Sequence, residues 1–174
     1  VVSLAKEIDR CILSEEEIAD DASNGLRSVR RAMKTAAEKI RTQLNSLVVN
    51  SRTYLQDGVI TMRNGRYCVP VKAEHKSNVP GMVHDQSSSG STIFVEPLSV
   101  VKLNNELREL EIREQKEIEA VLAALSNQTC DHLDELTLDL ELIGELDFIF
   151  AKAALSRHYR GCEPRLNKDG IIRL

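Results

Sequence analysis

Residues 57–97 read DGVITMRNGRYCVPVKAEHKSNVPGMVHDQSSSGSTIFVEP. Short runs of branched and aromatic residues alternate here with turn residues, a pattern typical of β-strands. The dipeptide Asn64-Gly65 is the strongest short-range signal for a type I′ hairpin, because both of its positions need a positive φ. We therefore predict a small antiparallel β module that opens with a tight hairpin. Its strands are expected at 59–63, 66–73, 82–86 and 92–95.

Pro70 interrupts the second of these strands. Proline has no N–H to donate to a β-ladder, so within sheets it is found at edges or bulges. We therefore expect the strand at 66–73 to be an edge strand or to contain a bulge.

Helical patterns flank the β module on both sides. Before it, apolar residues recur at spacings of three and four over 23–50, which predicts an amphipathic helix about 40 Å long at 1.5 Å per residue. After it, leucines at near-heptad spacing predict one helix over 98–125 and a second over 131–154, with a break at Ser126 and Asn127. Residues 170–174 have the pattern of a strand that is just beginning.

These elements together predict a mainly α chain with a small antiparallel β module, an α+β arrangement in which a long helical stalk carries a β-rich tip. The expected boundaries are 1–56 for the outgoing helices, 57–96 for the tip and 97–174 for the returning helices. The end of the chain within a strand-like run suggests that it is cut from a larger protein.

The charges are segregated along the chain. Its net charge is −4, yet 23–41 carries six basic residues and one acid, whereas 131–147 carries seven acids and no Lys or Arg. From charge alone, we expect the basic and the acidic helix to be neighbours, although exposed ion pairs contribute little each.

The composition excludes several classes of protein. With 42% hydrophobic and 29% charged residues, the chain resembles ordinary soluble proteins rather than disordered ones. No apolar run approaches the roughly 18–20 residues of a membrane span. The four cysteines are scattered, which indicates free thiols rather than a metal site or a disulfide framework. A cytoplasmic location is therefore expected.

The sequence shows no catalytic constellation. Between Gly81 and Gly90 the GK[ST] ending of a phosphate-binding loop is missing. His84 and Asp85 are adjacent on a predicted strand, so their side chains should point to opposite faces. We predict no catalytic residue, metal or cofactor in this chain, and we do not expect it to be an enzyme.

The tip carries a small excess of positive charge. Between 58 and 92 there are four Lys or Arg residues and two acids. Few aromatics accompany them, so a stacking platform for single-stranded bases is not expected. Contact with a phosphate backbone, without sequence readout, is the sharper hypothesis, and simple solubilisation of a small sheet is its alternative. The candidate nucleic-acid-binding residues are Arg63, Arg66, Lys72, Lys76 and His84.

Three long runs carry a resemblance to a known family. RNGRYCVPVK at 63–72, VHDQSSSGSTIFVEP at 83–97 and LNNELREL at 103–110 resemble the central segment of the bacterial MutS-two family. Members of this family are MutS paralogues that lack the mismatch-reading domain and end in an Smr nuclease domain. The runs at 20–31 and 145–153 are also similar, so the resemblance covers the whole chain. Cys68 departs from it, because a branched aliphatic residue is more usual there.

The resemblance implies that the chain is the lever and clamp region of a larger dimeric ATPase and endonuclease. ATP, Mg²⁺ and the nuclease site would belong to other domains, with the ATPase domain following 97–174. The family implies binding of branched or structured DNA and suppression of homologous recombination. One alternative is an arm of the same parent that contacts the ribosome or its RNA in ribosome rescue. A second is a structural coiled-coil spacer without a ligand.

Overall fold

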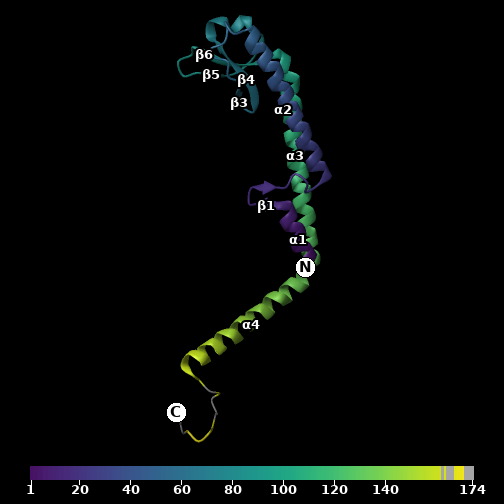
Figure 1. Cartoon of the computed structure of the whole chain (residues 1–174), viewed down its shortest axis with the longest axis vertical. Helices are drawn as coiled ribbons and strands as arrows, with labels where there is room; N and C mark the ends of the chain where they lie inside the picture. Colours follow the sequence, from purple (N-terminus) through teal and green to yellow (C-terminus); the bar gives the residue numbers. More distant parts are fainter. Residues whose placement is uncertain (162, 164–166, 171–174) are drawn as a thin grey trace.

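The computed structural model describes residues 1–161, 163 and 167–170. Figure 1 shows an elongated molecule with a β-rich tip at one end, a two-helix stalk, and a last helix that runs away from the stalk. The prediction of a mainly α chain with a small antiparallel β module is confirmed. The helices are α1 (Val2–Cys11), α2 (Asn24–Asn50), α3 (Leu98–Asp131) and α4 (Leu133–Tyr159), with a 3₁₀ segment η1 (Ala73–Asn78). The strands are β1 (Ile12–Ser14), β2 (Glu17–Ile18), β3 (Thr61–Arg63), β4 (Arg66–Lys72), β5 (Gly81–Gln86) and β6 (Thr92–Pro97).

The stalk consists of α2 and α3, which pack along each other. α2 begins where the sequence predicts, because the hydroxyl of Ser23 caps it by accepting a hydrogen bond from the backbone N–H of Leu26 at 2.9 Å. Leu26, Ile40 and Leu44, three of the apolar residues that recur along α2, are fully buried. Burial of this face against α3 supplies most of the stability of such a helix.

The tip has no core separate from that of the stalk. One apolar cluster contains Ile40 and Leu44 of α2, Val69 of β4, Val95 of β6 and Val100 of α3. A four-stranded sheet is too small to bury enough apolar surface by itself, so it shares the interior of the helices that carry it. The tip and the upper stalk therefore form one packed unit.

The four strands of the tip are all antiparallel and lie in the order β3-β4-β6-β5. Arg63 and Arg66 pair across a two-residue turn, in which Asn64 has φ 50° and Gly65 has φ 72°. The predicted type I′ hairpin is confirmed.

The expectation for Pro70 is wrong, because β4 is an interior strand and pairs with β6 without a register shift. The carbonyl of Pro70 accepts a hydrogen bond from the N–H of Gln56 at 3.0 Å, so its nitrogen also faces that side. There β3 has stopped pairing at Cys68, and only an isolated bridge between Leu55 and Val71 continues. The missing N–H therefore costs the β4–β6 ladder nothing.

The predicted break at Ser126 and Asn127 is also wrong. α3 runs through both residues to Asp131. Val121 and Leu125 are buried there against Cys11 of α1, and this packing outweighs the weak helix propensity of serine and asparagine. These residues belong to a second apolar cluster at the base of the stalk, where α1 and the β1–β2 hairpin pack against α3. Sequence patterns did not reveal α1 or this hairpin.

α4 is almost entirely exposed and extends away from the stalk (Figure 1). It carries the acidic run, so the expectation that the acidic helix lies beside α2 is wrong: the neighbour of α2 is α3. The strand predicted at 170–174 falls outside the described residues apart from Gly170. In the described part of the chain, none of the helices has the length and apolar character needed to span a membrane.

Candidate nucleic-acid interface

The β3–β4 hairpin and its neighbours bring the five predicted residues to the tip. Arg63 ends β3, Arg66 begins β4 and Lys72 ends it. Lys76 lies in η1 and His84 in β5. The structure therefore gathers all five on one small module, but their side chains have different partners.

Arg66 and His84 both bind the carboxylate of Glu96, which is 0% exposed. The Nη1 of Arg66 donates to Glu96 Oε1 at 3.0 Å, and the Nε2 of His84 lies 2.6 Å from Oε2. A buried carboxylate is strongly disfavoured unless it is paired and hydrogen-bonded, and these contacts satisfy that need. Both side chains are thus held toward the interior.

Asn104 ties this carboxylate to the stalk. It lies in α3, is 1% exposed, and its Nδ2 donates to Glu96 Oε1 at 2.8 Å. The same amide donates to the carbonyl of Tyr67 and accepts from the N–H of Tyr67, each at 3.2 Å. β4, β6 and α3 are therefore joined by one polar network.

Sequence reasoning missed Glu96 and Asn104 as site residues. Glu96 directly follows the mainly apolar run TIFV at 92–95, and Asn104 lies between Leu103 and Leu107 in a leucine-rich helix. A single polar residue inside an apolar pattern is the signal that could have found each of them, because a buried polar group needs a partner.

Arg63 is held by an aromatic ring and an acid. Its guanidinium carbon lies 4.1 Å from the centroid of the Phe94 ring, in a cation–π contact. Its Nε lies 3.2 Å from Asp85 Oδ2, an ion pair whose angle does not make a hydrogen bond. The charge of Arg63 is therefore already compensated within the tip.

Lys72 and Lys76 are the tip cations without an ion pair in the described part of the chain. The Nζ of Lys72 donates to the backbone carbonyl of Thr53 at 3.2 Å, which leaves its charge uncompensated. Lys76 is exposed and lines an open depression of about 470 Å³ between η1 and β5. Of the five predicted residues, these two are the best placed to meet an external anion.

The polar network around Glu96 and the cations Lys72 and Lys76 belong to a chain that is strongly similar to proteins named Endonuclease MutS2. The one from Agathobacter rectalis is 58% identical over the whole chain, and the one from Lachnospira eligens is 55% identical over the whole chain. The one from Lachnoclostridium phytofermentans is 53% identical over 97% of the chain. The chain belongs to the MutS2 family.

The chain spans only about a fifth of the length of these MutS2 relatives, 21–22% in the three cases. No family model matches it. The identity therefore extends across tip, stalk and α4, while four-fifths of each relative has no counterpart here.

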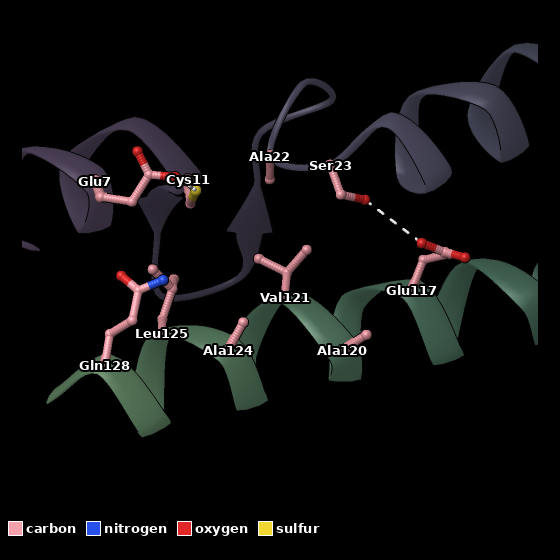
Figure 2. A pocket seen from close by; sticks show the side chains of 10 residues that line it. All are labelled: Glu7, Cys11, Ala22, Ser23, Glu117, Ala120, Val121, Ala124, Leu125 and Gln128. Carbon is pink, nitrogen blue, oxygen red and sulfur yellow. Dashed lines mark hydrogen bonds between the residues drawn. The ribbon is translucent and has the colours of Figure 1, made fainter. Parts of the chain in front are cut away.

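A second depression of the MutS2-family chain lies at the base of the stalk and has a volume of about 200 Å³. Figure 2 shows Glu117 on α3 opposite Ser23, with Glu7 and Cys11 on the far side. A Cβ on Gly25 would overlap the Glu117 carboxylate, which places this anion at the start of α2, where the helix dipole favours negative charge. Two carboxylates and small apolar side chains suit a structural cap better than a phosphate site.

The thiols of the MutS2-family chain differ in environment. Burial raises the pKa of Cys11. Burial, with the nearby Glu96 carboxylate, raises the pKa of Cys68 to about 11. Cys130 is exposed. Because the thiolate is the nucleophile, Cys11 and Cys68 are poorly suited to nucleophilic chemistry at neutral pH.

Iodoacetamide at pH 8 is expected to modify Cys130 well before Cys11 and Cys68, in a chain whose Cys162 is replaced by serine. Mass spectrometry of timed samples checks the order, and a urea-unfolded sample, in which all three thiols react alike, is the control. Equal rates of modification of Cys130, Cys11 and Cys68 in the folded chain would contradict the burial of Cys11 and Cys68.

The pKa of Cys68 in the folded chain exceeds its ordinary value of 9.0. The contribution of this thiol to stability is therefore present below pH 9 and is lost as the pH rises through about 11.

Proposed function

We propose that this chain is a non-catalytic lever and clamp segment whose β tip contacts the phosphate backbone of nucleic acid. The observation that carries the proposal is a pair of cations without an ion pair among the described residues, Lys72 at the end of β4 and Lys76 in the adjoining η1. They lie at a sheet that Asn104 and Glu96 join to a two-helix stalk. A tip fixed in this way can transmit the position of a bound backbone to the helices.

Contact with the backbone is favoured over base stacking because both aromatic rings of the sheet are covered. Phe94 lies under Arg63, and Tyr67 lies 5.9 Å from the guanidinium carbon of Arg41. Single-stranded bases need open aromatic faces on which to stack. Lysine, by contrast, meets a phosphate as a point charge without reading sequence.

The relatives are named endonucleases, and we propose that cleavage belongs to the four-fifths of the whole protein outside this chain, together with the binding of ATP and Mg²⁺. Two phosphate contacts give only weak affinity, on the order of 10⁻⁴ M at physiological salt. A homodimer of the whole protein would present two tips, and the second would act at high effective concentration. Tight binding would then require the dimer.

The target is proposed to be branched or structured DNA, with ribosomal RNA as the alternative ligand of the same tip. A structural spacer without a ligand is a different candidate, and one observation favours it: Arg63, Arg66 and His84 are all engaged by acids of the chain. The three functions differ in what happens when the two lysines are neutralised.

A double variant, Lys72→Ala with Lys76→Ala, is expected to weaken binding of the whole protein to branched DNA without changing its sequence preference. The logarithm of the affinity should fall less steeply with the logarithm of salt concentration, by about two units, because each lost phosphate contact removes about 0.9. Fluorescence anisotropy between 50 and 200 mM salt measures this slope.

The matched control is Lys6→Ala with Lys116→Ala, which removes the same charge from exposed positions on α1 and α3. The same titration with ribosomal RNA distinguishes the two nucleic acids by which ligand loses affinity. An unchanged slope for both DNA and RNA would rule out the clamp in favour of the spacer.

A further inference from the structure

α2 is the most basic element of the chain. It carries six Lys or Arg residues and a single acid, Glu38, although the whole chain has a net charge of −4. Its neighbour α3 carries seven acids and four bases. The positive charge of this protein is therefore concentrated on one side of the stalk rather than at the tip.

Four of these cations share one face of α2. Arg27, Arg31, Lys34 and Arg41 recur at intervals of four, three and seven residues, which places them in a row along the helix. All four are exposed, and the row points away from the face that buries Leu44 against the core. We name this row the stalk stripe. It extends over 14 residues, or about 21 Å at 1.5 Å per residue.

The cations of the stalk stripe mostly lack ion pairs with the described residues, and Glu38 is the one acid on the same face of α2. Arg31 and Lys34 have no ion pair with any described residue, and their side chains make no hydrogen bond to one. Arg27 lies 3.6 Å from the exposed Asp21, and Arg41 reaches the Tyr67 ring at 5.9 Å. The structural arginine of α2 is a different one, outside the stripe.

That residue is Arg30, which is half-buried and fixes α2 to its surroundings. It donates to Glu114 of α3 at 2.7 Å, to the carbonyl of Ile18 at 2.8 Å and to Asp20. Burial alone would lower the pKa of Arg30, but the two carboxylates raise it above its usual value. The attachment of α2 is thus complete without the stripe, whose cations remain available.

We propose that the stalk stripe is a second surface for the phosphate backbone of duplex nucleic acid, continuing the contact made by the tip along the stalk. This inference rests on the proposed function. A stripe of about 21 Å spans roughly six base pairs, at about 3.4 Å of duplex axis per base pair. Arginine, which supplies three of its four charges, binds phosphate in a bidentate manner.

A duplex fits the stripe better than a single strand or a protein does. α2 contains no aromatic residue, so it offers unpaired bases nothing to stack on. Its one exposed large apolar residue is Val49, near its C-terminus and beyond the stripe, whereas protein interfaces are built around apolar and aromatic anchors. A straight helix can lie along the axis of a duplex, because a duplex is stiff over this length.

The test compares Arg31→Ala with Lys34→Ala, as a double variant of the whole protein, against a control that loses the same charge elsewhere. The control is Lys39→Ala with Lys116→Ala, because Lys39 lies on a different face of α2 and Lys116 lies on α3. The ligands are 20-base-pair duplexes of DNA and of RNA. Helical circular dichroism of the 174-residue chain verifies that both variants fold.

For the stripe variant, the slope of log affinity against log salt concentration should be shallower by about two units. Between 50 and 200 mM salt, the drop in affinity should therefore be about tenfold smaller than for the wild type. The control should behave as the wild type. Glu38→Gln, which removes the one acid within the stripe, should bind the duplex more tightly. Arg31→Lys with Lys34→Arg keeps both positive charges and should bind the duplex as the wild type does.

Wild-type binding by the stripe variant would overturn the inference, and so would an equal loss in the control. A changed oligomeric state in sedimentation with unchanged duplex binding would also overturn it, in favour of a protein contact. The double variant Lys72→Ala with Lys76→Ala distinguishes these outcomes from failure of the proposed function. If it weakens binding while the stripe variant does not, the tip proposal stands and only the stripe proposal fails. If the wild type binds neither duplex nor branched DNA, both fail.

Discussion

Glu96→Ala is expected to lower the free energy of unfolding by about 3–5 kcal/mol, the range for removing one member of a buried, hydrogen-bonded charge pair. The carboxylate satisfies Arg66, His84 and Asn104 at once, and its loss leaves the buried amide of Asn104 without that acceptor. Urea unfolding of the 174-residue chain, followed by circular dichroism, measures the change.

Glu96→Gln is the matched control, because it keeps the shape and the carbonyl acceptor and should cost less than the alanine variant. Arg66→Ala is also expected to destabilise, since it strands a fully buried carboxylate. In the double variant the two losses should overlap rather than add, which a double-mutant cycle detects. Additive losses would show that the network is not a unit. Arg66 is a candidate nucleic-acid-binding residue from the sequence, and its buried partner gives it a structural role as well.

Leu44→Ala is expected to cost about 2–5 kcal/mol, because Leu44 is 0% exposed and its truncation leaves a cavity. The cavity lies where α2 meets the tip, in the cluster shared with Val69 and Val95. In a chain whose Tyr54 and Tyr159 are replaced by phenylalanine, helical circular dichroism and the fluorescence of Tyr67 in the tip should therefore shift to lower urea together.

Val49→Ala is the control on the same helix, since Val49 is 76% exposed and should change stability by less than about 0.5 kcal/mol. Two separate transitions in the Leu44 variant, with the helices more stable than the tip, would contradict the shared core.

Local chemistry made parts of this fold predictable. Asn64 and Gly65 specify their turn by themselves, because only a few residue types accept a positive φ. Ser23 specifies the start of α2 in the same way, through a hydrogen bond three residues along the chain. The wrong expectations were the edge or bulge at Pro70 and the helix break at Ser126, where contacts with distant segments outweigh local preference.

The candidate site was likewise predictable where local sequence decides and unpredictable where distant segments decide. The residue types that carry charge at the tip can be read from the sequence, but their availability cannot. Arg66 is engaged by Glu96, 30 residues away, and His84 by the same acid, 12 residues away. Arg31 and Lys34 were visible as part of a basic helix. Which cations lack an ion pair among the described residues depends on where α3 and the segment after β2 place the acids Glu114, Asp20 and Asp21.

α4 and the tip, at opposite ends of the molecule (Figure 1), open with different kinetics. A helix of 27 residues that makes almost no tertiary contacts is retained chiefly by its own backbone hydrogen bonds. Helix–coil relaxation of an isolated segment of about this length takes about 0.1–1 μs. The amides of the upper stalk and tip exchange with solvent chiefly when the shared core opens, on the much slower scale of cooperative unfolding. In deuterated water, α4 should therefore be fully exchanged while Leu44 and Val69 remain protected.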